Sequence, residues 1–179
     1  MRRPDLEHLI RAAAAVSGED DIVVVGSQAV LGSFPDAPAE LLVSVEADLY
    51  PRDRPERATD IDGAIGEGSI FFDTFGYYAH GVGPETAKAP AGWEGRLVLL
   101  RNENTRGAAG WCLEPHDLVL AKCVAGREKD RAFAAAALRH GLVDGEQLLR
   151  SLPLLPVDDA TREHVAQLVR GAIVQAGRG

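Results

Sequence analysis

The stretch IVVVGSQAVLGSF at residues 22–34 leads a buried strand directly into a short helix. Ile22 to Val25 is an unbroken β-branched run, which is typical of a strand buried on both faces. Gly26-Ser27 ends this strand, and residues 28–34 are then predicted to be helical. A glycine there lets the backbone approach a ligand closely, and the serine can cap the helix or donate its hydroxyl to a phosphate oxygen. Taken alone, this pattern is usually no more than a helix cap.

The next segment, LLVSVEADLY at residues 41–50, alternates and predicts a half-buried strand that ends at Pro51. Its expected core face carries Leu41, Val43, Val45, Ala47 and Leu49. Glu46 and Asp48 lie on the other face, where two carboxylates at i and i+2 can chelate one or two hard cations such as Mg²⁺. A solvated acidic strand face is the plain alternative. The pairing with Gly26-Ser27 across a short helix favours the metal site.

The remaining pattern predicts an α/β (α+β) fold, a mixed sheet flanked by helices with a helical C-terminal part. We expect further strands at 77–82, 96–101 and 111–113. We expect helices at 5–16, 55–66, 69–76, 115–125, 128–140, 144–152 and 159–175. Residues 1–113 would form the α/β core, and residues 114–179 a helical part packed on it as one globular unit.

Composition narrows the class of protein. The chain has 179 residues, 46% of them hydrophobic, and contains no apolar run long enough to span a bilayer. No apolar segment follows Arg2-Arg3, so we expect no signal peptide. A formal net charge of -8 argues against general DNA binding. Cys112 and Cys123 lack zinc-type spacing, which favours reduced thiols in a cytoplasmic protein. Basic residues gather at Arg52, Arg54 and Arg57, and again at Lys122, Arg127, Lys129 and Arg131.

Lys122 stands in an otherwise almost entirely apolar helix. On a continuous helix it shares a stripe with Leu118, Ala125 and Lys129, and Asp130 lies beside that stripe. A buried ammonium group is costly without a partner. It can therefore form a salt bridge with Asp130 or Glu46, or it can contact a triphosphate or orient an acceptor hydroxyl.

Two motifs resemble a known superfamily. Val25-Gly26-Ser27-Gln28-Ala29-Val30 followed by Ser44-Val45-Glu46-Ala47-Asp48 resembles the minimal nucleotidyltransferases. Residues 114–122 (EPHDLVLAK) with 126–130 (GREKD) are similar to the C-terminal motif of nucleotidyltransferase-like toxins. Those toxins belong to toxin–antitoxin and abortive-infection systems. The similarity covers about residues 20–140.

The resemblance implies transfer of a nucleoside monophosphate from an NTP to an acceptor hydroxyl, at the 3′ end of tRNA or on a protein. It implies Mg²⁺, in a two-metal arrangement, and a cognate antitoxin as partner, with no membrane. Metal ligands would be Glu46 and Asp48, and catalytic residues Asp48, Glu46, Lys122 and Asp130. Nucleotide-binding residues would be Gly26, Ser27, Lys122, Arg127 and Lys129.

The sequence departs from the superfamily at one point. Many members carry a third acidic residue on a later strand, whereas residues 96–101 contain none, which leaves Glu103, Asp117 and Asp130 as candidates. A second Asp-x-Asp, at Asp60 and Asp62, is expected on a helix surface. The five histidines show no metal spacing. Two other functions therefore stay open: a non-catalytic nucleotide-binding or regulatory module, and a transferase for a small cationic acceptor of the aminoglycoside type.

Overall fold

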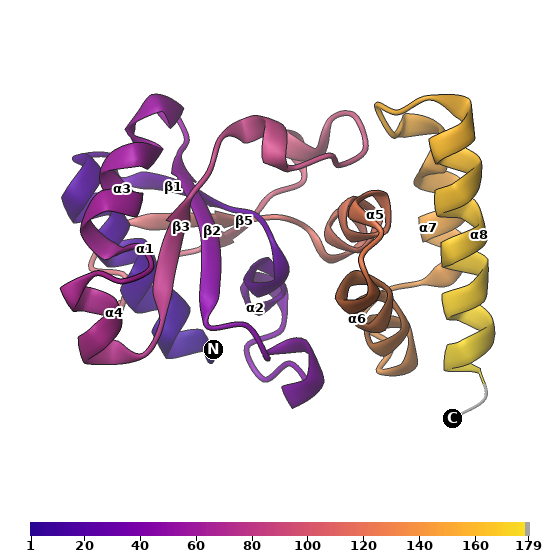
Figure 1. Cartoon of the computed structure of the whole chain (residues 1–179), viewed down its shortest axis with the longest axis horizontal. Helices are drawn as coiled ribbons and strands as arrows, with labels where there is room; N and C mark the ends of the chain where they lie inside the picture. The colour runs from indigo at the N-terminus through magenta and orange to yellow at the C-terminus, as the bar shows by residue number, and fades with distance from the viewer. Residues whose placement is uncertain (178–179) are drawn as a thin grey trace.

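A five-stranded mixed sheet forms the centre of the protein, in a computed structural model that describes residues 1–177 (Figure 1). Its strands are β1 (Asp21–Val24), β2 (Glu46–Pro51), β3 (Tyr78–Gly81), β4 (Val98–Leu100) and β5 (Ala109–Cys112), in the order β3-β2-β1-β5-β4. Strand β1 runs antiparallel to β2 and parallel to β5. Strand β3 is parallel to β2, and β4 is antiparallel to β5. The predicted fold class is confirmed.

Helices cover both faces of the sheet. In Figure 1, α1, α3 and α4 lie on one side, and α2 with the C-terminal helices on the other. The helices are α1 (Arg3–Ser17), α2 (Val30–Ser33), α3 (Ala58–Ile65), α4 (Ile70–Phe75), α5 (Pro115–Ala125), α6 (Glu128–Arg139), α7 (Gly145–Ser151) and α8 (Asp159–Ala176). Short 3₁₀ turns lie at Ser27–Ala29, Ala39–Leu41, Pro55–Arg57, Pro84–Thr86, Trp93–Gly95 and Leu152–Leu154. The last two residues of the predicted helical part 114–179 lie outside the described residues. No helix in the described part is long and apolar enough to cross a membrane.

The central strand follows from its sequence. Ile22, Val23 and Val24 are all buried, because β1 is hydrogen-bonded on both edges and covered on both faces. The chain leaves this strand at Gly26-Ser27 and turns at once into the 3₁₀ turn Ser27–Ala29 and helix α2, as the sequence predicts. Gly26 and Ser27 are thereby held beyond the carboxyl end of the central strand of the sheet.

The predicted strand 41–50 is wrong in its first half, because β2 begins only at Glu46. Val43 is 79% exposed and Val45 46%, so neither lies on a core face. Ala39–Leu41 form a 3₁₀ turn after Pro38, and the Ser44 carbonyl accepts from the Gln28 side chain. In residues 41–45, the 3₁₀ turn and the contact from Gln28 take the place of the backbone hydrogen bonds that a strand would form with a neighbouring strand. Within β2, Ala47 and Leu49 are buried as predicted.

A parallel connection through two helices brings a further strand beside the carboxylates. Strand β2 is followed by α3 and α4 and then by the parallel strand β3, which is the usual form of a βαβ unit. The register sets Glu46 opposite Tyr78 and Asp48 opposite His80. Asp60 and Asp62 are exposed on α3 and flank the buried Ile61, so the second Asp-x-Asp lies on a helix surface, as predicted.

Helix α5 is anchored at its first turn. The Glu114 carboxylate accepts from the backbone N–H groups of His116 and Asp117 and so caps the helix. Arg96 then donates to both oxygens of Asp117, from Nε at 2.8 Å and from Nη2 at 3.0 Å. Because this bidentate pair ties the helix to the segment before β4, it fixes the direction in which α5 presents Lys122.

Candidate metal and nucleotide site

Three side chains converge at one end of the sheet: Glu46 and Asp48 from β2 and His80 from β3. Nδ1 of His80 lies 3.3 Å from Oδ1 of Asp48 and 3.7 Å from Oε1 of Glu46. One ligand atom from each residue falls within 4.8 Å of the other two. The Asp48 side chain is 23% exposed, that of Glu46 39% and that of His80 52%. The group is therefore open to a ligand on one side and backed by the sheet on the other.

Gly26 forms the floor under Asp48. Its backbone has φ 63° and ψ -174°, a region that only glycine adopts readily. A Cβ atom at this position would lie 2.0 Å from Oδ2 of Asp48. The Val25 N–H also donates to the Asp48 carbonyl, at 3.0 Å. Gly26 thus makes room for the carboxylate, and the antiparallel β1–β2 pairing sets its position.

The electrostatics of this group favour a bound cation. Burial raises the pKa of Asp48, the charge of Glu46 raises it further, and His80 acts in the opposite direction. Tyr78 donates its hydroxyl to Oε2 of Glu46 at 2.9 Å, and burial together with this bond raises the pKa of Tyr78 to about 12. Two carboxylates held this close repel each other, and a divalent ion would relieve that repulsion. Donor types, spacing and the space left by Gly26 all fit such an ion.

A cationic wall from α5 and α6 faces the carboxylates. Nζ of Lys122 lies 3.0 Å from Oδ1 of Asp130, and Nε of Arg127 lies 2.8 Å from Oδ2. Asp130 is fully buried, with both oxygens occupied, and Nζ of Lys122 also lies 5.3 Å from the Phe133 ring centroid. The salt bridge between Lys122 and Asp130 is therefore present, whereas Glu46 belongs to the facing carboxylate group. Asp130 thus holds the side chains of Lys122 and Arg127 in place, and both of its carboxylate oxygens are paired with them.

A single cavity of about 600 Å³ joins the two walls. Seven of the site residues predicted from the sequence line it: Ser27, Glu46, Asp48, Lys122, Arg127, Lys129 and Asp130. Gly26 lies directly behind Asp48. The volume is within the range of small-molecule sites. The arrangement can hold a divalent cation on one side and a polyphosphate on the other.

The comparisons with known proteins agree with this geometry. Residues 4–152 match the model of a family described as "Nucleotidyltransferase of unknown function (DUF6036)". The chain belongs to this family. The matched residues contain all five strands and helices α5 to α7, and hence every residue of the cavity. Searches among curated proteins and among solved structures each found no match. Family membership supports general nucleotidyl transfer as the reaction class.

None of the expected candidates for a third acid joins Glu46 and Asp48. Glu103 follows β4, which lies at the opposite edge of the sheet from β2 and β3. Asp117 is paired with Arg96, and Asp130 with Lys122 and Arg127. The side chain beside the carboxylates is His80, which the sequence analysis missed. The alternation of Tyr78, buried Ala79 and His80 indicates only that His80 lies on the face opposite to Ala79, because its position beside Asp48 is set by the pairing of β2 with β3.

Asp130 is expected to contribute strongly to the stability of this nucleotidyltransferase. Replacing it with alanine should cost about 3–5 kcal/mol of unfolding free energy, because Lys122 would be left buried without its partner. Arg57 and Asp60 make a matched control, since they form the same i,i+3 contact at 2.9 Å on the exposed surface of α3. There, Asp60→Ala should cost about 0–1 kcal/mol. Urea denaturation of both variants measures the difference.

The contribution of Asp130 also has a defined pH dependence. Burial alone would raise the pKa of Asp130, but the hydrogen bonds from Arg127 and Lys122 outweigh it and lower the pKa below that of an ordinary aspartate. The stabilisation is therefore fully present above the pKa of an unfolded aspartate and is lost as pH falls through the lower folded value. The gap between wild type and Asp130→Ala should shrink below about pH 4. If Asp130→Ala loses no more unfolding free energy at pH 7 than Asp60→Ala does, Asp130 does not contribute to stability as assigned here.

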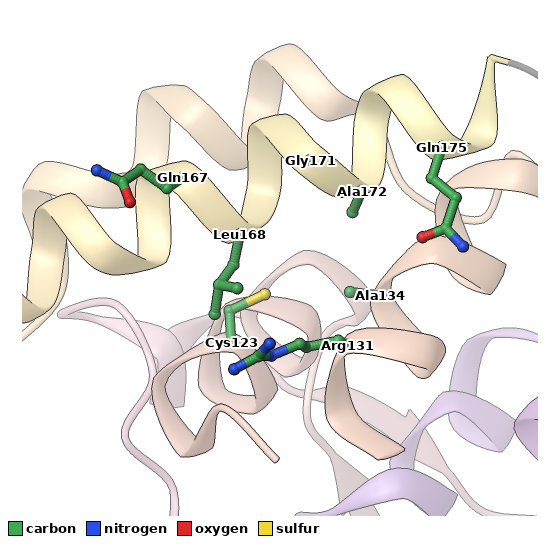
Figure 2. A pocket seen from close by; sticks show the side chains of 8 residues that line it. All are labelled: Cys123, Arg131, Ala134, Gln167, Leu168, Gly171, Ala172 and Gln175. Atoms are coloured by element: carbon green, nitrogen blue, oxygen red, sulfur yellow. The ribbon is translucent and has the colours of Figure 1, made fainter. Parts of the chain in front are cut away.

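The remaining basic residues lie elsewhere. Arg52 follows β2 at the end away from Glu46 and stacks on Trp111, 4.7 Å from the ring centroid. Figure 2 shows Arg131 and Cys123 beneath α8, beside a second cavity of about 260 Å³. Burial raises the pKa of the Cys123 thiol to about 12, and the residues lining this cavity include no carboxylate. The cavity in front of Glu46 and Asp48 is therefore the candidate site.

Proposed function

We propose that this protein transfers a nucleoside monophosphate from an NTP to an acceptor hydroxyl, with Mg²⁺ held by Glu46 and Asp48. The observation that carries the proposal is one cavity with a carboxylate pair on one wall and Lys122, Arg127 and Lys129 on the other. A polyphosphate needs cations along its length, and its reacting end needs a divalent ion. Both requirements are met within a single cavity.

In this proposal the residues lining the cavity have separate roles in binding the cation and the phosphates. A divalent cation at Glu46 and Asp48 would neutralise the α-phosphate and lower the pKa of an attacking hydroxyl, in a one- or two-metal arrangement. Ser27 lines the cavity next to Asp48 and can donate its hydroxyl to a phosphate oxygen. Lys122 and Arg127, oriented by Asp130, and the exposed Lys129 would stabilise charge on the leaving group.

The reaction balances without any further reagent. The acceptor oxygen forms a bond to the α-phosphorus, and the bond from that phosphorus to the oxygen bridging to the β-phosphorus breaks. Pyrophosphate leaves with the electron pair of the broken bond, and the proton of the acceptor hydroxyl is released to solvent. The product is an acceptor that carries a phosphodiester-linked nucleoside monophosphate.

For the acceptor, we propose the 3′ end of tRNA or a protein hydroxyl, as the resemblance to nucleotidyltransferase-like toxins suggests. Arg127, whose side chain is 62% exposed, and the exposed Lys129 give the cavity a basic rim suited to RNA phosphates. An enzyme of that kind in the cytoplasm, where NTPs are abundant, would need a restraining antitoxin as partner. A small cationic acceptor would instead use the acidic wall of Glu46 and Asp48.

The test is a labelled transfer assay. The full chain is incubated with a divalent cation, each α-³²P-NTP in turn, and total tRNA, total protein or a panel of aminoglycosides. Label in tRNA or protein that requires the divalent cation supports the macromolecular acceptor, and label in an aminoglycoside replaces it with a small-molecule acceptor. Binding of an NTP without label in any acceptor would overturn the transfer proposal and favour a binding module.

A further inference from the structure

We infer that His80 supplies a nitrogen ligand to the cation at Glu46 and Asp48, so that the site prefers a first-row transition-metal ion such as Mn²⁺ over Mg²⁺. The inference rests on the proposed function only in that it uses the same cation site. It assigns a role to His80 on β3, which lies beside Glu46 and Asp48 where none of the expected third-acid candidates does.

The positions of the three side chains fit one ion. On an octahedral ion with bonds of about 2.1 Å, neighbouring ligand atoms lie about 3 Å apart. Nδ1 of His80 lies 3.3 Å from a carboxylate oxygen of Asp48 and 3.7 Å from one of Glu46. Small side-chain rotations therefore bring all three atoms onto a common centre. The parallel β2–β3 register, with Asp48 opposite His80, keeps the imidazole in reach.

The donor set determines the preference. Mg²⁺ binds oxygen ligands almost exclusively and keeps several waters, whereas imidazole nitrogen is a good ligand for first-row transition ions. Two carboxylates and one imidazole make a mixed set that Mn²⁺ accepts readily. With three protein ligands, an octahedral ion keeps open positions for phosphate and acceptor oxygens.

The surroundings of His80 argue against a purely structural role. Its side chain is 52% exposed, and the carboxylates of Glu46 and Asp48 are the partners found for its ring among the described residues. It does not join the aromatic cluster that holds His8 against Phe71, Phe75 and Tyr77. It also does not fasten two elements together, as His116 does by accepting from the Asp144 N–H at 2.9 Å. His80 is thus free to turn toward an ion.

Metal binding to the full chain, without nucleotide, tests the inference directly. Free Mn²⁺ is followed by electron paramagnetic resonance, and Mg²⁺ affinity is obtained by competition. His80→Ala should weaken Mn²⁺ binding by roughly tenfold or more. Mg²⁺ binding should change by less than about threefold, because it depends on the carboxylate oxygens. His80→Asp should lower the ratio of Mn²⁺ to Mg²⁺ affinity below that of the wild type. The exposed His164 on α8 supplies the control His164→Ala, which should match the wild type in both affinities.

A spectroscopic signature separates ligation from a structural effect. Pulsed electron paramagnetic resonance of the Mn²⁺-loaded wild type should show coupling to a directly bound nitrogen, and this coupling should be absent from His80→Asp. Thermal unfolding in EDTA checks that each variant is folded. We expect the His80 variants to fold, because the side chain is exposed. Wild-type Mn²⁺ affinity in His80→Ala, or no nitrogen coupling in the wild type, overturns the inference and leaves the proposed transfer intact. If neither ion binds the wild type, both the inference and the metal-dependent transfer fail.

Discussion

Replacing Asp48 with asparagine should abolish nucleotidyl transfer while leaving the protein at least as stable as the wild type. Asp48 is the more buried of the two carboxylates, and it alone lies against Gly26. Without this charge, a cation held as proposed at Glu46 and Asp48 would lose one of its two carboxylate ligands, and kcat/KM should fall on the order of a thousandfold. The measurement is transfer of label from an α-³²P-NTP to the acceptor identified for the wild type.

Although Asp48→Asn should lose activity, we expect it to keep or gain stability. Burial first, and then the charge of Glu46, raise the pKa of Asp48, which means that the folded, metal-free protein disfavours the ionised form. The neutral amide removes that repulsion, so the metal-free variant should unfold at the same temperature as the wild type or higher. Asp73→Asn, on the exposed surface of α4, is the control and should keep full activity. Loss of stability together with activity in Asp48→Asn would mean that Asp48 is a structural residue.

Much of the fold could be predicted because local patterns and tertiary packing agree. The β-branched run from Ile22 to Val25 predicts a buried strand, and its first three residues lie buried in β1 (Asp21–Val24). Pro115 after a capping Glu114, together with a glycine at 126, places helix α5 at its predicted bounds. Residues 41–45 were mispredicted because alternation alone does not show whether a neighbouring strand is available. There, a 3₁₀ turn and a side-chain contact from Gln28 take the place of a ladder.

The site residues also differ in whether the sequence alone could place them. Glu46 and Asp48 could be placed together because two residues of one strand share a face whatever its neighbours are. The Lys122–Asp130 contact could be foreseen as one of two possible salt bridges of Lys122, since both residues lie near each other on consecutive helices. His80 could not, because its place beside Asp48 depends on the pairing and register of β2 and β3, more than thirty residues apart. Glu46 and Asp48 are therefore close together because they are close in sequence. His80 joins them only because the fold pairs β3 with β2.

Gly26→Ala should disable the site through sterics alone, without removing any ligand. The new Cβ would lie 2.0 Å from Oδ2 and 3.0 Å from Cγ of Asp48, so the carboxylate has to move. The backbone conformation, with φ 63° and ψ -174°, is strained for any residue with a side chain and adds about 1–3 kcal/mol. We expect kcat/KM to fall on the order of a hundredfold, because a shift of about 1 Å in a catalytic group has that effect.

Gly76→Ala separates strain from displacement. Gly76 also has a positive φ, of 74°, but a Cβ there would meet no atom within 4 Å. This variant should lose about 1–2 kcal/mol of stability and keep its transfer activity and Mn²⁺ affinity. Gly26→Ala should lose both activity and cation affinity, by the same assays. Asp48 keeps its charge in Gly26→Ala. A loss of activity and of cation affinity in this variant would therefore result from displacement of the Asp48 carboxylate. If Gly26→Ala instead behaves like Gly76→Ala, the position of Asp48 against the β1 turn has no part in the chemistry.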